Sequence, residues 1–523
     1  MSVRYRKAKD KSVLKQLQTV LRLEAAQNYS PLYTRFFAMN ETNWNNVNLE
    51  TDWWLQSITD ASGVVTVGNA EGEQREVQCF VKYSPLLDPN RYMSGGYHDA
   101  NVLQMPSFND SSVFPKLAEA NNSAYVDGFF YFLSSQLKKT RPHFVHSIEF
   151  YGNFLGLKKD FEYNLDDEYI LHTTFFQTNH GKLFLAESNP DAMNHPDSRH
   201  HVVPLETEEG AVVLDGVEEV IVVAAAQCEE VPCEELCEFE PPLEVSSTEV
   251  VASQDNNSDS SNTDDEEGED VWSEFDDDDD MYEPQRITIT TFPVQTIFME
   301  RCVATLDSLL EKITPDELAS ALLQIIFTLM VYQAEYEFTH NDLHTNNVMY
   351  VATTEPFLYY SVGKQTYKVP TYGRIYKIID FGRSIYKFKG QRFMSDSFHC
   401  QGDAAGQYNT EPFYDASKPR LEPNYSFDLC RLACSMVDVL PETDEFKELI
   451  DVVEDWCTDD KGKNVVYKAN GEERYPNFKL YKMIARTVHA HTPEAQLDRL
   501  VFQRFAISKK QAKGASAIIV VKP

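Results

Sequence analysis

The chain has 523 residues, of which 42% are hydrophobic, and its 82 Asp and Glu against 47 Lys and Arg give a formal charge of −35. This length fits roughly two to four domains of about 100 to 200 residues each. The segment between Arg199 and Arg286 holds 29 of the acids and no Lys or Arg, which leaves 53 acids against 47 bases elsewhere. A chain-wide basic surface is therefore excluded, and we expect no direct nucleic-acid binding.

The sequence offers no signal for export or for a membrane span. No apolar run approaches the roughly 20 residues that cross a bilayer, and the charged N-terminus is not followed by an apolar signal core. The nine cysteines are an odd number without CxxC spacing, which suits a reducing compartment. We therefore expect an intracellular, cytoplasmic protein.

Residues 1–55 are predicted to form an N-terminal extension with a basic amphipathic helix. The first 30 residues carry seven Lys and Arg. Their apolar residues fall on one helical face, at Val13, Leu14, Leu17, Val20 and Leu21. Such a helix either packs on its own domain or contacts a membrane surface or nucleic acid.

Residues 56–205 mix strand and helix patterns, which predicts an α+β unit. Residues 64–67 and 76–82 are rich in β-forming residues and flank a glycine-containing loop, so they predict a hairpin. Residues 124–133 have a helical pattern, whereas residues 144–157 and 169–185 favour strands.

Residues 206–283 are predicted to be a disordered acidic insertion. Their Ser, Asn, Pro and acid runs cannot bury enough apolar surface to offset the loss of chain entropy. Within them, the Val and Ile content of residues 211–226 favours a strand. Cys228, Cys233 and Cys237 follow, but their spacing matches no zinc site.

The rest of the chain is predicted to be one strand followed by a mainly helical region. Residues 284–303 contain a strand pattern over 287–300, and residues 304–523 follow. Thr314, Pro315 and Glu317 form a capping box with proline at the first helical position, which predicts a long buried helix. A second helix-rich stretch runs from Phe427 to the C-terminus, with little strand pattern before residue 517.

Two motifs follow the predicted long helix. The first is HNDLHTNN at residues 340–347, and the second is DFG at residues 380–382, which begins 33 residues beyond Asn347. A hydrophobic strand pattern leads into the second motif. Each string alone is a moderately specific signal. Together they are a strong signal, because they occur in this order and at this spacing, with a predicted helix before the first string and a predicted strand between the two.

This pair resembles the protein-kinase superfamily, which has HxDLxxxN and DFG in this order. A narrower resemblance is to the atypical serine/threonine kinase-like proteins of large nucleocytoplasmic DNA viruses, carried by HNDLHTNN, IIDFGRS, CFVKYSPLLDP and the extended segment 356–374. The resemblance implies a two-lobed α+β fold with a β-rich N-lobe that holds the acidic insertion and a helical C-lobe. It also implies a location in the cytoplasm of an infected host cell or in the virion.

The function implied is transfer of the ATP γ-phosphate to serine or threonine hydroxyls of a protein substrate. Such transfer needs carboxylates that hold Mg²⁺, or Mn²⁺ in its place, against the phosphates and a group that orients the hydroxyl. On the motif match, Asp342 would be the catalytic base. Asn347 would be a second metal ligand, and Asp380 the principal one.

The resemblance also assigns a phosphate-binding lysine. The string QCFVK at residues 78–82 is similar to the third strand of the family, which would make Lys82 the residue that pairs with the α and β phosphates. Its acidic partner would come from the helix at 124–133. Asp127 lies within this helix and therefore fits this role better than Glu119, which lies before it.

The strand at 287–300 is similar to the family's last N-lobe strand, with the hinge at its end. On that match Met299 would be the gatekeeper, and backbone groups from Glu300 to Cys302 would contact adenine. Asp428, in a string similar to the start of another family helix, would brace the backbone of the catalytic loop.

Several departures from the family pattern keep two other functions open. No GxGxxG precedes Lys82, so the phosphate-covering loop is expected to lack glycine, and no APE follows the DFG. These absences favour a weak or inactive kinase-fold scaffold that binds nucleotide. Asn341 stands where many kinases have an arginine that pairs with a phosphorylated loop. His344 replaces a common lysine, as in small-molecule phosphotransferases, which favours that class as a third possibility.

The acidic insertion has two functional interpretations. It is either a solvated spacer or a regulatory segment. The second interpretation rests on Ser261, Thr263 and Ser273, which each have an acid three residues later, the pattern that acid-directed kinases phosphorylate. The negative charge also suits docking of a basic partner or masking of a basic surface.

Overall fold

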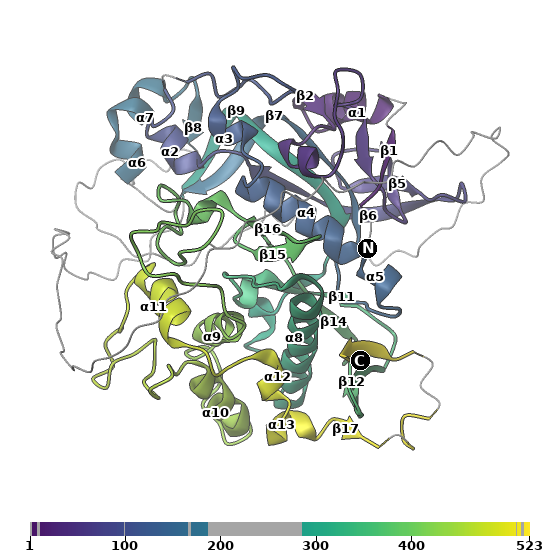
Figure 1. Ribbon diagram of the computed structural model, residues 1–523, viewed down its shortest axis with the longest axis vertical. Helices are drawn as coiled ribbons and strands as arrows, with labels where there is room; N and C mark the ends of the chain where they lie inside the picture. Colours follow the sequence, from purple (N-terminus) through teal and green to yellow (C-terminus); the bar gives the residue numbers. More distant parts are fainter. Residues whose placement is uncertain are drawn as a thin grey trace, which may run out of the picture.

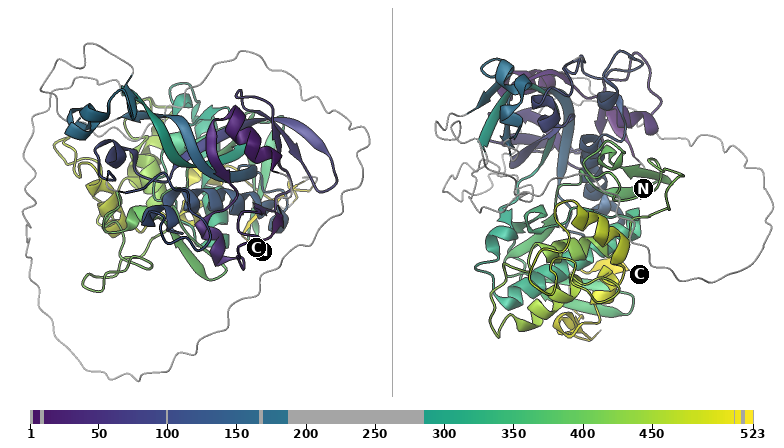
Figure 2. Two further views of the ribbon diagram at one scale, coloured as in Figure 1. Left: turned by 90° about the horizontal axis from the view of Figure 1, so that it is seen from above. Right: turned by 90° about the vertical axis from the view of Figure 1, so that its left-hand side faces the viewer.

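The computed structural model describes residues 3–7, 11–98, 100–165, 169–186, 285–508, 510–513 and 517–522. The acidic insertion predicted at 206–283 lies outside the described residues, together with its cysteines and its serine and threonine sites. The described residues contain both strands and helices, which confirms the predicted α+β class. The strands of the N-terminal part lie at the top of Figure 1 and helices α8 to α13 lie below them, an arrangement that Figure 2 shows from two further sides.

A seven-stranded sheet forms the N-terminal part. Its order is β2-β7-β9-β6-β5-β4, and β8 also pairs with β9. Every described pairing in it is antiparallel, and bulges in the β2–β7, β4–β5 and β7–β9 pairs increase its twist, so that the sheet curls. The strands are β2 Leu23–Gln27, β4 Trp54–Ile58, β5 Val64–Gly68, β6 Gln74–Pro85, β7 Phe150–Leu165, β8 Phe184–Ala186 and β9 Gln285–Glu300. The predicted hairpin is confirmed as β5 and β6, and the strand at 287–300 as β9.

The first 55 residues contribute directly to this sheet. The predicted amphipathic helix is α1 Ser12–Val20, and its Leu17 is completely buried, so its apolar face packs on the fold. The following strand β2 pairs with β7 in the main sheet. Strand β1 Tyr5–Lys7, which precedes α1, pairs with β3 Val47–Leu49, which follows β2. The 3₁₀ helix η1 Pro31–Arg35 lies between β2 and β3 in the sequence.

Helix α4 Ser123–Ser135, predicted at 124–133, packs between the sheet and the C-terminal part (Figure 1). Nearly all of its residues are buried. Gly128 lies where α4 crosses β9, and a Cβ at this position would be only 2.2 Å from Nε2 of Gln295. Glycine therefore allows the close approach of helix and sheet. The shorter helices nearby are α2 Pro89–Met93, α3 Pro115–Ala118 and α5 Leu137–Thr140.

The predictions of strands at 144–157 and 169–185 need correction. The first strand begins only at Phe150, and the second region forms α6 Tyr169–His172 and α7 Thr174–Asn179 before the short β8. The side chain of Thr173 accepts a hydrogen bond from the backbone N–H of Phe176 and thereby caps α7. This local cap outweighs the strand propensity of the aromatic residues around it.

The C-terminal part is built around α8 Pro315–Tyr336, whose capping box forms as predicted. By length and composition α8 could cross a membrane, but 89% of its apolar window is buried inside the fold, as expected of a core helix. The remaining helices are α9 Phe427–Cys434, α10 Lys447–Trp456, α11 Lys479–Thr487, α12 Pro493–Gln496 and α13 Leu500–Gln503.

The C-terminal part holds more strands than predicted. The segment at 356–374 forms a hairpin as expected, but other strands are only two to five residues long, too short to show an alternating pattern. The hairpin strands are β12 Phe357–Val362 and β13 Gln365–Pro370. The other strands are β10 Ala304–Thr305, β11 Val348–Ala352, β14 Arg374–Ile378, β15 Ile385–Phe388, β16 Gln391–Met394, β17 Ala506–Ile507 and β18 Ile519–Lys522. β18 pairs in parallel with β12, so the end of the chain closes this small sheet.

Aromatic packing joins α4 to the segments that carry the two motifs. The ring of Phe130 on α4 stacks on Phe338 at a centroid distance of 4.5 Å and lies 4.6 Å from the ring of Phe381. All three rings are completely buried. Because aromatic contacts of this kind have preferred geometries, they fix α4 relative to both motif segments.

A buried histidine joins two of the small sheets of the C-terminal part, those of β14 and of β12. His146 is completely buried, and its Nδ1–H donates to the carbonyl oxygen of Tyr376 while its Nε2 accepts from the Tyr360 hydroxyl, both at 2.8 Å. This arrangement requires the neutral ring. Burial lowers the pKa of His146 from 6.5 to about 4.

We predict that His146 makes the fold sensitive to acid. Its pKa is lower in the folded chain than in the unfolded chain, so the stability that it contributes is complete above about pH 6.5 and is lost as the pH falls through 4. The difference in free energy of unfolding between wild type and His146→Gln should therefore narrow as the pH is lowered from 7 to 4. Urea denaturation at several pH values measures this difference, and a constant difference would contradict the prediction.

Candidate functional site

The segment between α8 and β11 carries the first motif, and helix α9 holds its backbone. The buried carboxylate of Asp428 on α9 accepts hydrogen bonds from the backbone N–H groups of His340 and Asn341, each at 2.9 Å. Burial raises the pKa of Asp428, although these N–H groups and His340 oppose the rise. The predicted bracing of this backbone by Asp428 is confirmed.

Two residues of the site have strained backbone conformations. Asn341 has φ of 65° and Asp380 has φ of 61°. Residues other than glycine rarely adopt this left-handed backbone conformation. Asn341 is held there by the Tyr408 hydroxyl, which donates to its Oδ1 at 2.7 Å, and by its own Nδ2, which donates to the carbonyl of Arg383 at 3.0 Å. Such strain persists only where the surroundings fix it, and it is frequent at functional sites.

The β11–β14 ladder places the two motifs side by side. Val348 pairs with Ile378 in this antiparallel pair, and the N–H of Ile379 donates to the carbonyl of Asn347 at 3.0 Å. Asn347, the last residue of the 3₁₀ turn η4 Thr345–Asn347, therefore lies next to the segment that begins with Asp380. Its Nδ2 donates to the carbonyl of Asp342 at 3.0 Å.

Lys82 lies between two carboxylates. Its Nζ is 3.0 Å from Oδ2 of Asp127 and 3.0 Å from Oδ1 of Asp380. Strand β6, helix α4 and the turn after β14 thus bring together three of the residues that the sequence singled out. The side chain of Asp127 is 2% exposed, that of Lys82 21% and that of Asp380 37%, so the cluster opens toward solvent at Asp380.

The charges of this cluster stabilise one another. Burial opposes the charge of Lys82, but Asp127 and Asp380 outweigh burial and raise the pKa of the lysine well above its ordinary value. Burial raises the pKa of Asp127 despite the nearby lysine. For Asp380 burial acts in the same direction, but the charge and hydrogen bond of Lys82 outweigh it and lower the pKa. Asp380 therefore remains an ionised carboxylate near neutral pH.

One face of α4 also holds the backbone of the DFG motif. The N–H of Phe381 donates to Oδ1 of Asp127, and the N–H of Asp380 donates to the hydroxyl of Tyr131, both at 2.8 Å. Asp127 and Tyr131 are one helical turn apart and therefore share a face. Sequence reasoning missed Tyr131, although its i, i+4 spacing from Asp127 was a usable signal.

The carboxylate of Asp342 faces three residues that sequence reasoning also missed. The hydroxyl of Tyr481 on α11 donates to its Oδ1 at 2.7 Å, and Nη1 of Arg383 lies 3.6 Å from its Oδ2. Burial works against the charge of Asp342, but Arg383 and Arg431 outweigh burial and lower the pKa to about 2. Only Arg383 had a sequence signal, because it directly follows the DFG.

Met299, Glu300 and Cys302 lie at the end of β9. Met299 is buried and is two residues beyond Ile297, the β-pairing partner of Lys82. The N–H of Glu300 donates to the carbonyl of Glu149, and the carboxylate of Glu300 forms an ion pair with Lys377. Cys302 is half-buried. The ladder between β6 and β9 joins this end of β9 to the strand that carries Lys82.

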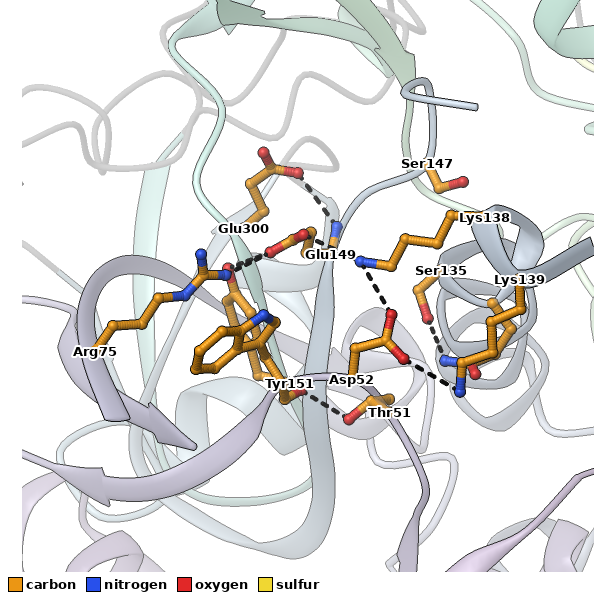
Figure 3. Close-up of polar contacts among 12 residues, drawn as sticks. Thr51, Asp52, Arg75, Ser135, Lys138, Lys139, Ser147, Glu149, Tyr151 and Glu300 are labelled. Atoms are coloured by element: carbon orange, nitrogen blue, oxygen red, sulfur yellow. Dashed lines mark hydrogen bonds and ion pairs between the residues drawn. The ribbon is translucent and has the colours of Figure 1, made fainter. Parts of the chain in front are cut away.

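A second polar network surrounds Glu300 at the end of β9 (Figure 3). Glu149 forms ion pairs with Arg75 and Lys138, and Lys138 also contacts Asp52. Glu300 reaches the same network, because its carboxylate accepts from the N–H of Glu149 at 3.2 Å. Cations and carboxylates alternate in it, so its charges are neutralised within the fold, and we assign it a structural role at the end of the strand.

Metal binding at the site would depend on Asp380 and Asn347. Among the described residues, no group of three or more His, Cys, Asp and Glu side chains is arranged to hold a metal ion. Mg²⁺ is usually held by one or two carboxylates together with substrate phosphates rather than by a cage of protein ligands. The Asp380 carboxylate and the Asn347 amide oxygen would be enough protein ligands for a Mg²⁺ ion that is also bound by the phosphates of its substrate.

Comparisons with known proteins give no family for the chain. Neither a protein-family model nor a curated protein matches it. The chemistry of the site therefore has to be argued from its own residues.

We predict that Asp428→Ala lowers the free energy of unfolding by at least about 2 kcal/mol, because two buried N–H groups lose their acceptor. Asp451→Ala is the matched control. Asp451 is an exposed aspartate on the neighbouring helix α10, paired only one turn away with Lys447. This control should change stability by less than about 0.5 kcal/mol. Equal effects in urea denaturation would show that the buried carboxylate is not the brace.

Proposed function

We propose that the protein is an atypical serine/threonine protein kinase that transfers the γ-phosphate of ATP, in the presence of Mg²⁺, to hydroxyls of a protein substrate. The observation that carries the proposal is the position of Lys82 between Asp127 and Asp380 at 3.0 Å from each. A two-lobed kinase-like arrangement, with the sheet and α4 above the motif-bearing segments, is part of this proposal.

The residues of the cluster have the charges that phosphoryl transfer needs. When bound, Mg²⁺ and ATP supply the phosphoryl group and neutralise its negative charge. Lys82, kept protonated by its two carboxylates, would bind the α and β phosphates. Asp380, kept ionised by Lys82, would hold the metal together with the amide oxygen of Asn347. Met299 and the backbone from Glu300 to Cys302 would contact adenine.

Asp342 would act mainly by orienting the acceptor hydroxyl. Its pKa of about 2 makes it a weak base near neutral pH, but an ionised carboxylate still accepts a hydrogen bond from a hydroxyl. In a loose, metaphosphate-like transition state, proton removal by a base contributes little to the rate, and correct positioning of the reactants contributes much. The low pKa is therefore compatible with phosphoryl transfer.

The turn between β4 and β5 would cover the phosphates. It spans residues 59–63 and ends at Gly63, so it contains a glycine, contrary to the expectation from sequence. Gly63 has φ of 88°, and a Cβ there would be 2.8 Å from the carbonyl oxygen of Cys79. Glycine at this position allows the turn to lie close to β6. The turn does not contain a GxGxxG motif. We therefore expect weaker nucleotide binding than a glycine-rich loop gives.

Ion pairs hold the segment that follows the DFG. Arg420 contacts both Glu411 and Glu422, and Arg392 contacts Glu422 at 2.9 Å. Together with the bond from Tyr408 to Asn341, these contacts fix the segment without any added phosphate. They support an enzyme that needs no phosphorylation of this segment, in agreement with the absence of an arginine at position 341.

A kinase-fold scaffold that binds nucleotide without transferring phosphate is the second candidate. The observation that favours it is the Asp342 carboxylate, whose Oδ1 already accepts a hydrogen bond from Tyr481 and whose Oδ2 lies 3.6 Å from Arg383. A small-molecule phosphotransferase remains the third candidate, on the basis of His344 and of the HxDLHxxN pattern, which antibiotic-type phosphotransferases share. The viral location and a basic partner for the acidic insertion remain predictions from the sequence.

We predict that purified wild-type protein transfers label from γ-labelled ATP in the presence of Mg²⁺ to itself or to a generic protein substrate. Asp380→Asn should reduce transfer at least about a hundredfold, because it removes the metal-binding charge, and Asp342→Asn should also reduce it strongly. Asp451→Asn on exposed α10 is the control and should transfer label as wild type does.

The outcomes separate the three candidates. Label on serine or threonine that depends on Asp380 supports the protein kinase. Absence of transfer by wild type, combined with a rise in melting temperature on addition of ATP, supports the scaffold. Transfer only to members of a metabolite panel supports the small-molecule enzyme, and equal transfer by wild type and Asp380→Asn contradicts the proposed site.

A further inference from the structure

Tyr481 reaches the proposed catalytic aspartate from a distant part of the chain. It lies on α11, 139 residues beyond Asp342, and its hydroxyl donates to Oδ1 of Asp342 at 2.7 Å. Its ring stacks on Phe478 at a centroid distance of 5.1 Å with an interplanar angle of 15° and contacts Phe427 on α9. The packing therefore holds the hydroxyl in one place.

Arg431 fixes the direction of this hydrogen bond. Its Nε donates to the Tyr481 hydroxyl at 2.9 Å, and its guanidinium lies 5.1 Å from the centre of the same ring. A guanidinium can only donate, so the hydroxyl must accept from Arg431 and has its own proton for Asp342. Burial raises the pKa of Tyr481 to about 12, which keeps that proton on the hydroxyl.

Arg431 is a buried cation that lacks a close carboxylate. Its side chain is only 6% exposed, and no carboxylate of the described residues lies within 4.0 Å of its nitrogens. A buried charge of this kind is costly unless polar groups compensate it. The hydroxyl of Tyr481 provides such a group, and it also donates to Asp342.

The two oxygens of Asp342 consequently have different surroundings. Oδ1 accepts a short hydrogen bond from Tyr481, whereas Oδ2 lies 3.6 Å from Arg383, which is beyond hydrogen-bond length. Oδ2 is thus the oxygen that can accept a hydrogen bond from another hydroxyl. Arg383 is itself anchored by an ion pair with Asp403 at 2.7 Å.

We propose that Tyr481, oriented by Arg431, is a positioning residue that binds Oδ1 of Asp342 and thereby directs Oδ2 to the hydroxyl of the protein substrate. This inference rests on the proposed kinase function and extends it to two residues outside both motifs. A fixed carboxylate matters because small errors in the placement of a reacting group reduce the rate strongly.

Tyr481→Phe tests this proposal, because it removes only the hydroxyl and keeps the stacked ring. We expect kcat to fall about 10- to 100-fold, while KM for ATP changes by less than about twofold. We also expect the acidic limb of the pH–rate profile to move to higher pH, since Asp342 loses a hydrogen bond that favours its charged form. Arg431→Met should reproduce the fall in kcat in a weaker form.

Tyr467→Phe is the matched control. The hydroxyl of Tyr467 also donates to an aspartate, Asp438, but this pair lies on the surface and makes no contact with Asp342 in the described structure. Its removal should leave kcat and the pH profile unchanged. Thermal unfolding of all three variants shows that they are folded before their rates are compared.

The outcomes distinguish this proposal from the function on which it rests. A wild type that transfers no phosphate to any acceptor contradicts the proposed function, and the positioning role falls with it. An active wild type with an equally active Tyr481→Phe contradicts the positioning role alone. An increase in kcat of Tyr481→Phe also overturns it, because Tyr481 would then block the place of the substrate hydroxyl.

Discussion

The ammonium group of Lys82 is the interaction on which the arrangement of the site depends. It joins strand β6, helix α4 and the turn after β14, which are separated by up to 298 residues of sequence. Removal of charged groups from water costs several kcal/mol for each ion, and this cost is recovered only when the partners stay in contact. If β6 or α4 moved away alone, the buried carboxylate of Asp127 would therefore lose its cation.

The two carboxylates of this cluster have different environments and so different roles. Asp127 is almost completely buried, and it also accepts hydrogen bonds from Ser84 and from the N–H of Phe381. It is a structural partner of the lysine. Asp380 is more exposed and has a strained backbone, and its charge depends on the same lysine. An anion that drew Lys82 away would change the surroundings of Asp380 while Asp127 and Tyr131 continued to hold the backbone.

The sequence allowed prediction of the parts that have a local or a motif signal. The hairpin of β5 and β6, the helices α1, α4 and α8 and the long strand β9 follow from periodicity and capping residues. The choice of Asp127 over Glu119 followed from its place within a helix, and the structure brings Asp127 to Lys82. The α6–α7 region was predicted wrongly because the cap at Thr173 outweighs the strand propensity of its neighbours.

Other features had no signal that a single sequence could show. The contribution of β2 to the main sheet depends on pairing with β7, more than 120 residues later, and neither strand specifies its partner locally. Tyr481 lies 139 residues beyond Asp342 in a segment without a recognisable motif. Arg431 lies 89 residues beyond Asp342, on the same helix as Asp428 but outside the string that the sequence singled out. Their roles come from tertiary packing of α9 and α11, which brings together groups whose spacing in sequence carries no information.

Helix α9 unites the backbone and side-chain constraints on the first motif. Asp428 and Arg431 are three residues apart and so lie on the same face of the helix. Asp428 accepts from the backbone N–H groups of residues 340 and 341, while Arg431 acts through Tyr481 on the side chain of Asp342. A single buried helix face therefore determines both where the loop runs and how its carboxylate is oriented.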